Sequence, residues 1–175
     1  MRRRVGGVLG ALLATTIVLP SAPALGATTE GPETFTGAVV ASGRSGTRTV
    51  LRSAVVARGV FNGIGRIVEV PNRPTDPDDV SRDDIVFAAG ALHLVTKTSG
   101  LSISMNQRTC AFAARARQTT TVEGGSGRLR AATGRFTGTV EAVGLAARAA
   151  DGSCTVQRDP LAEFDALRSR GSLSF

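Results

Sequence analysis

The chain has 175 residues, with 21 Lys and Arg against 14 Asp and Glu, so its formal net charge is +7. Trp and Tyr are absent, and no dense Lys/Arg stripe follows the first few residues, so the composition argues against nucleic acid as a partner. Gly, Thr, Val, Ala and Ser dominate the remainder, which favours strands and turns over helices.

The N-terminus predicts an export signal. Three arginines at positions 2–4 precede an apolar run at Val5–Leu19, and the small residues PSAPALGA follow. This order is typical of a secretory signal peptide, and the run is shorter than the roughly 20 apolar residues of a transmembrane helix. We therefore expect residues 1–27 to be removed and the protein to be secreted.

Cleavage is expected near Ala27, with Ala24 and Gly26 as alternative sites. The remaining residues, 28–175, suit one domain and are enough for a hydrophobic core. Loss of the three leading arginines leaves 18 basic and 14 acidic residues, a net charge of +4. No second long apolar run follows, so no transmembrane segment is expected after signal cleavage.

Short strand-forming segments follow one another along the mature chain. Asp151-Gly152 is a two-residue hairpin signal, and a loop is expected at 71–84, which holds three Pro and five Asp. A short helix is predicted over 159–170, where Leu161, Phe164 and Leu167 have helical spacing. The strand candidates are 34–42, 47–57, 60–70, 84–97 with a break at Gly90, 101–105, 108–122, 135–149, 153–157 and 169–175.

Alternation in the later strands predicts an antiparallel barrel. Phe136 and Val140 share one face of their strand, while Arg135 and Thr139 share the other. The segment 112–117 has the same period, with Phe and Ala opposite Arg. One Phe and several small residues on each inward face suit the interior of a small closed barrel, and eight strands fit the length. A two-sheet β-sandwich is the alternative architecture.

Cys110 and Cys154 are the two cysteines of the chain. In an oxidising compartment they are expected to form one disulfide, with two buried free thiols as the alternative. A simple meander, however, would leave them about 9.5 Å apart on either side of one strand, and a bridge needs Cα atoms within about 7 Å. Either a strand splays at the barrel end, the register differs, or the thiols are free.

The segment 123–138, EGGSGRLRAATGRFTG, is the most specific motif. We expect a Gly-rich strand connection in which Leu129 and Phe136 fill the core. The Lys and following Ser/Thr of a phosphate-binding loop are missing. The segment resembles the GG-(Thr/Ser)-G-x-(Phe/Leu)-x-x-Ala-x-G-x-(Phe) signature of allene oxide cyclase and dirigent-like barrel proteins, in particular their small secreted bacterial relatives.

The resemblance extends over about 58–175. It implies an eight-stranded antiparallel barrel of a superfamily that is often oligomeric, so a homo-oligomer is an expectation. Plant members include a cyclase and proteins that steer radical coupling. No catalytic motif matches residue by residue, and the tyrosines of dirigent-type sites are missing.

The single histidine and the clustered aspartates do not indicate a catalytic or metal site. His93, the single histidine, is expected to be structural or at the surface, because no nucleophile motif accompanies it. The aspartates at 76, 78, 79, 83 and 84 lack EF-hand spacing, so a solvated acidic loop beside Arg73 and Arg82 is expected rather than a calcium site. No metal site and no cofactor are predicted.

Glu69 is the best single catalytic candidate. It shares a strand face with Phe61 and Ile67, and an inward Glu69 suits general acid/base chemistry. The alternative is an acid at the barrel rim, paired with Arg66 or Arg73.

The expected function is a secreted, non-catalytic barrel that binds a small apolar ligand or a protein partner. The alternative is a cofactor-free cyclase or isomerase acting on an apolar small molecule in the lumen. A third hypothesis is an envelope protein that acts through oligomerisation. A lumen-facing Glu69 in an apolar pocket would favour the enzyme, and an interior filled with Phe and Val would favour a packed scaffold.

Overall fold

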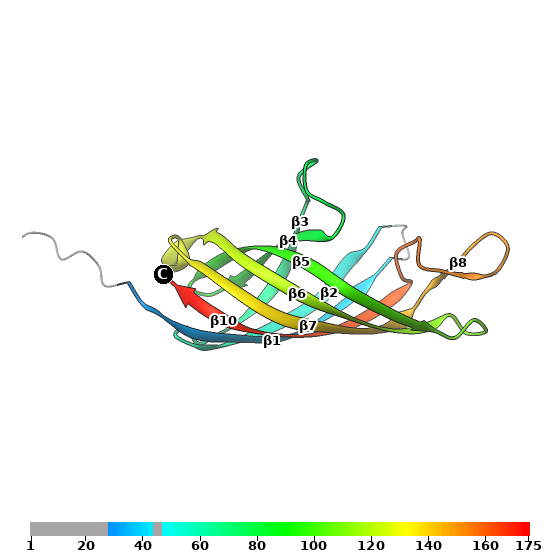
Figure 1. The fold of residues 1–175 in the computed structure, drawn as a ribbon, viewed down its shortest axis with the longest axis horizontal. Coiled ribbons are helices and arrows are strands. Elements are labelled where there is room, and N and C mark those ends of the chain that lie inside the picture. Colours follow the sequence, from blue (N-terminus) through cyan, green and yellow to red (C-terminus); the bar gives the residue numbers. More distant parts are fainter. Residues whose placement is uncertain (1–27, 44–46) are drawn as a thin grey trace, which may run out of the picture.

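The computed structural model describes residues 28–43 and 47–175, and the predicted signal peptide lies outside these ranges. Within them, eight long antiparallel strands close into an elongated barrel, in the spatial order β1-β10-β7-β6-β5-β4-β3-β2 (Figure 1). These strands are β1 (Glu30–Ser42), β2 (Thr49–Gly59), β3 (Gly63–Val70), β4 (Val80–Phe87), β5 (Gly90–Met105), β6 (Ala111–Gly125), β7 (Thr133–Leu145) and β10 (Ala162–Ser174). The predicted barrel is confirmed, and the sandwich alternative is wrong.

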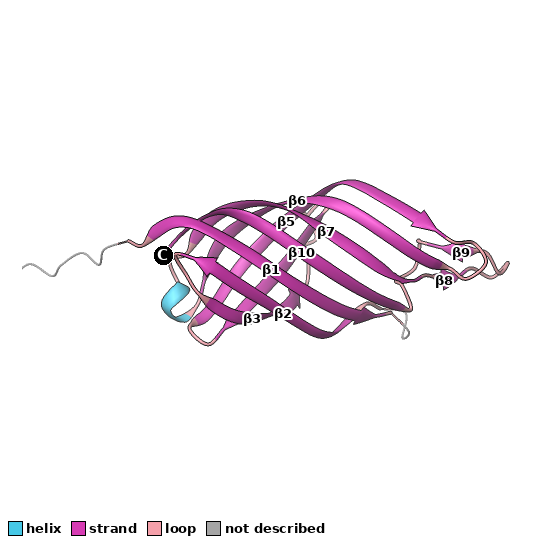
Figure 2. Cartoon of the chain, turned by 90° about the horizontal axis from the view of Figure 1, so that it is seen from below, coloured by secondary structure: helices cyan, strands magenta, loops and turns pink. Residues whose placement is uncertain are grey.

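Three further elements lie outside the barrel wall. The short strands β8 (Ala147–Arg148) and β9 (Cys154–Thr155) pair with each other at one end, and the 3₁₀ turn η1 (Gly127–Leu129) lies at the other (Figure 2). The residues before β1 and the C-terminus meet beside η1, where Thr29 and Phe175 exchange two backbone hydrogen bonds of 3.0 Å. No helix in the described residues is long and apolar enough to cross a membrane.

The helix predicted over 159–170 is wrong. These residues enter β10, which pairs with β1 on one side and with β7 on the other. Glu163, Asp165 and Leu167 face the lumen, whereas Phe164 and Arg168 face outward. Pairing on both edges closes the barrel and satisfies the backbone of every neighbouring strand, which outweighs a weak helical pattern.

Most strand boundaries differ from expectation by a few residues, and three differences change the assignment of a segment. β4 begins at Val80, so Asp83 and Asp84 belong to a strand and not to the acidic loop. The piece predicted at 101–105 continues β5 beyond an irregularity in the β5–β6 ladder between Ser99 and Ser102. Residues 60–62 form the turn before β3.

Packed apolar side chains fill the end of the barrel near η1. Phe35 and Phe136 have ring centroids 4.9 Å apart, and Leu129 of η1 is fully buried beneath them. Gly127 has φ +58°, a conformation that glycine adopts without strain. The motif at 123–138 therefore does what its composition predicts: it connects β6 to β7 and contributes Leu129 and Phe136 to the core.

Cys110 and Cys154 form a disulfide, with Cα atoms 5.3 Å apart. The predicted bridge is confirmed, and the expected separation of about 9.5 Å was wrong because Cys154 does not continue the barrel meander. It lies in β9, where it pairs with Arg148, and its sulfur reaches the carbonyls of the β5–β6 turn. The bridge therefore fastens the β8–β9 hairpin to that turn.

Candidate ligand site in the barrel lumen

The barrel interior is hollow beyond the packed end. Two adjoining hollows of about 340 Å³ each share Gln118, Val140 and Asp165 in their walls. The first hollow lies toward β8 and β9 and is mostly apolar. Its principal wall residues are Ile103, Phe112, Ala114, Ala116, Ala142 and Val156.

The apolar wall follows from the alternation of β6 and β7. Phe112, Ala114 and Ala116 point inward, and each pairs with an inward residue of β7: Phe112 with Gly144, for example, and Ala114 with Ala142. Small side chains at these positions leave space where larger ones would fill the barrel. The hollow is thus encoded by the Ala and Gly residues of two neighbouring strands.

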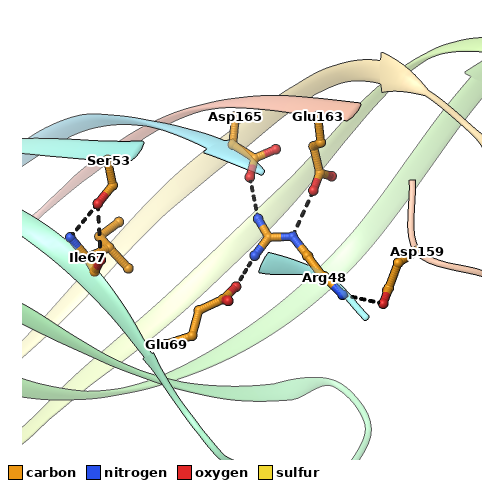
Figure 3. A network of polar contacts seen from close by, with 7 residues as sticks. All are labelled: Arg48, Ser53, Ile67, Glu69, Asp159, Glu163 and Asp165. Carbon is orange, nitrogen blue, oxygen red and sulfur yellow. Dashed lines mark hydrogen bonds and ion pairs between the residues drawn. The ribbon is translucent and has the colours of Figure 1, made fainter. Parts of the chain in front are cut away.

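The second hollow contains a network centred on Arg48 (Figure 3). The guanidinium donates from Nε to Glu163 Oε2 at 2.8 Å and from Nη2 to Asp165 Oδ2 at 2.9 Å, and its Nη1 pairs with Glu69. The Arg48 backbone N–H donates to Asp159 Oδ2 at 2.7 Å. Arg48 therefore joins β3 and β10 through its guanidinium, and the segment before β10 through its backbone N–H.

Asp83 adds a fourth carboxylate to the lumen wall. It lies directly opposite Glu69 on neighbouring strands, and like charges in this arrangement repel. Burial and the charge of Glu69 raise the pKa of Asp83 to about 6, although Arg48 opposes the shift. Burial and the charge of Glu163 raise the pKa of Asp165 to about 6 as well, again against Arg48.

Asp165 holds an acceptor that the protein leaves unpaired. The residue is 8% exposed, and its Oδ1 is a buried oxygen without a hydrogen-bond partner. Asp165 lies in the wall of both hollows, and Gln118 and Glu163 are further polar residues in the wall of the apolar one. A buried unpaired acceptor is costly, and a bound donor removes that cost.

The ladder between β2 and β3 is short beside the network. Direct pairing of these strands is limited to Val55–Ala57 with Gly63–Gly65. Further along, the Ser53 hydroxyl accepts from the Ile67 N–H at 2.9 Å and donates to its carbonyl at 3.1 Å (Figure 3). A recess of about 550 Å³ follows, and Arg48 and Glu69 line both this recess and the second hollow.

Glu69 faces the lumen on the same side of β3 as Ile67, as the alternation predicts. Its side chain is 40% exposed, and its partner is Arg48 rather than Arg66 or Arg73. Carboxylates and apolar residues both surround Glu69. The lumen is therefore neither the apolar pocket expected of an enzyme nor the filled interior expected of a packed scaffold. The barrel is packed at one end and hollow at the other.

The other sequence candidates lie outside the lumen. His93 Nδ1 is 2.7 Å from Asp84 Oδ1 on the exposed outer face. Asp76 accepts from the Arg82 guanidinium and from the Arg73 backbone N–H, and the bond to Arg82 lowers the pKa of Asp76 to about 2. Across the described ranges, 28–43 and 47–175, no group of three or more His, Cys, Asp or Glu side chains is arranged to hold a metal.

Sequence reasoning missed Arg48, Glu163 and Asp165. Glu163 and Asp165 alternate with Leu167, which indicates three side chains on one face of a strand. The helix predicted over 159–170 placed these side chains differently. Arg48 was predicted to belong to the strand at 47–57, but it lies in the loop before β2, where no alternation indicates its direction. Buried Glu33 was also missed: it is 1% exposed, and its carboxylate accepts the backbone N–H of Phe61 at 2.8 Å.

Neither family models, nor curated proteins, nor solved structures give a match to this chain.

Proposed function

We propose that this protein is a secreted, non-catalytic carrier that binds a small apolar molecule in its barrel lumen. The observation that carries the proposal is the apolar hollow of about 340 Å³ with the unpaired Asp165 carboxylate oxygen in its wall. Ligand sites of this size commonly combine apolar walls with a few placed polar groups. The ligand has an apolar body and one hydrogen-bond donor, such as a hydroxyl or an amine.

A fluorescence titration with N-phenyl-1-naphthylamine tests the proposal, because this probe is apolar and carries one N–H donor. Ala114→Phe fills the hollow, and we expect it to weaken probe binding about tenfold or more. Ala113→Phe is the matched control: Ala113 is the preceding residue of β6, but it is exposed on the outer face. Equal affinities of the two variants would contradict the proposal.

The lumen carboxylates favour a second candidate, a cofactor-free cyclase or isomerase. Asp83 and Asp165, with pKa values raised to about 6, suit proton transfer near neutral pH, and Glu69 lies opposite Asp83. The test is conversion of cyclohex-3-en-1-one to its conjugated isomer, followed by ultraviolet absorbance. The enzyme hypothesis expects turnover that Asp83→Asn and Glu69→Gln abolish, and it fails if the wild-type rate equals that of buffer.

We further propose that the chain is related to the allene oxide cyclase and dirigent-like barrels. The closed eight-stranded barrel and the position of the 123–138 motif between β6 and β7 support the relationship. The proposal includes secretion after cleavage near Ala27. Intact-mass measurement of protein from the culture medium tests it: a mass that retains residues 1–27 would contradict removal of the signal.

A further inference from the structure

Apart from Arg52, Arg66 and Arg115, the outer wall of the barrel carries a group of five exposed arginines on four strands. Arg58 lies on β2, Arg117 on β6, Arg135 on β7, and Arg168 and Arg170 on β10. Their side chains alternate with inward residues, so all five point away from the lumen.

The pairing of neighbouring strands places these arginines next to threonines. In one row across the sheet, Thr137, Arg170, Thr34 and Arg58 are successive partners. In the next row, Arg117, Thr139, Arg168 and Thr36 are successive partners. Alternate strands in a sheet are about 10 Å apart, so arginines repeat at that spacing across the wall. We call these two rows, together with Arg135, the arginine–threonine face.

The arginines of this face have no acidic partner within the described chain. The ion pairs of the barrel involve other cations, such as Arg48, Arg82 and Arg115. Neither row contains Asp or Glu, and Glu141 in the adjoining row of β7 pairs with Arg115, so the face has an excess of positive charge. Such a surface attracts anions over about a Debye length.

The face is also slightly hollowed. A shallow depression of about 580 Å³ is lined by Thr34, Thr36, Arg117, Thr139, Arg168 and Arg170, among others. Guanidinium groups bind sulfate and carboxylate groups through paired donors, and the threonine hydroxyls between them donate to and accept from sugar hydroxyls. The rows contain no aromatic side chain to stack on bases or to enter a bilayer.

We propose that the arginine–threonine face binds an anionic polysaccharide. This interaction goes beyond the lumen function, because the inward and outward side chains of the same strands serve different partners. It would hold the barrel on an acidic glycan while the lumen remains free.

The test is calorimetric titration of the purified protein with heparin, a sulfated polysaccharide, and with neutral dextran. We expect heparin to bind and dextran not to bind. The double variant Arg168→Gln/Arg170→Gln should weaken heparin binding about tenfold, on the scale of exposed charge pairs. Arg58→Gln/Arg117→Gln should reproduce the loss, which guards against a folding defect in one variant.

The matched control is Arg52→Gln/Arg66→Gln, which removes the same charge from exposed positions outside the face. We expect it to change heparin affinity less than twofold, given that surface substitutions away from a contact have small effects. An equal loss in control and test variants would overturn the proposal, since binding would then follow net charge alone. Tighter binding to duplex DNA or to phosphatidylglycerol vesicles would overturn it in favour of another polyanion.

Discussion

Asp83 is one of two lumen residues, with Asp165, whose charge opposes folding. Its carboxyl pKa is raised from 3.8 to about 6, chiefly by burial and by Glu69 opposite it. As pH rises from about 4 to 6, the unfolded chain loses this proton first, so deprotonation favours unfolding and stability falls. This loss of stability is absent at low pH and is complete above the pKa that Asp83 has in the folded state.

Asp83→Asn should therefore raise the melting temperature at pH 7.5 and leave it nearly unchanged at pH 4. After allowance for solvent screening, the gain at pH 7.5 is about 1–2 kcal/mol. Thermal melts from pH 4 to 8 measure it. Asp84→Asn is the control, because Asp84 is the next residue and faces outward beside His93. A gain equal at both pH values, or equal in the control, would contradict the account.

Arg48 compensates three carboxylates in the lumen. Replacement by Gln leaves Glu69, Glu163 and Asp165 facing one another without a cation. We expect Arg48→Gln to lower the free energy of unfolding by about 2 kcal/mol at pH 8, since breaking a partly buried ion pair strands its partners. Chemical denaturation measures the loss, and exposed Arg52→Gln should stay within about 0.5 kcal/mol of wild type. Comparable losses in both variants would remove Arg48 from its proposed role.

The 3₁₀ turn η1 closes one end of the barrel. Its Leu129 is fully buried, whereas the preceding Arg128 is exposed. Leu129→Ala should cost about 2–5 kcal/mol, because the cavity it leaves is enclosed by the packed end of the barrel. Urea denaturation with Arg128→Ala as control tests this. A loss below 1 kcal/mol would show that the end of the barrel can repack around the gap.

The β8–β9 hairpin covers the other end. Thr155 and Val156 contribute to the wall of the apolar hollow, and the Cys110–Cys154 bridge, 44 residues apart in sequence, holds the hairpin in place. Cys110→Ser/Cys154→Ser should lower stability by about 4 kcal/mol in the chain-entropy model. It should also weaken binding of N-phenyl-1-naphthylamine. A variant with unchanged melting temperature and probe affinity would contradict this role for the bridge.

Sequence patterns within single strands and turns are enough to predict the barrel. The alternation through Phe136 and Val140, and the turn residues of the 123–138 motif, predict the inward face, the core residues and the closed sheet. These are properties of a strand and its neighbours in sequence, so they can be read without the tertiary structure.

The candidate site was less predictable, because it depends on contacts between distant segments. Arg48 meets Glu163 across 115 residues. Glu69 was predicted to face inward, but its partner comes from a loop whose path no local pattern sets. The error over 159–170 has the same origin: a strand that closes a barrel is stabilised by partners that its own sequence does not reveal.

The central claim is that a small apolar molecule occupies the lumen. Alanine methyl NMR during titration with N-phenyl-1-naphthylamine tests it directly, because alanines lie on both faces of β6. The account predicts shifts at Ala114, Ala116 and Ala142, which line the hollow, and none at outward Ala113. Shifts confined to outward alanines, or lumen methyls that stay unchanged while the probe binds, would contradict it.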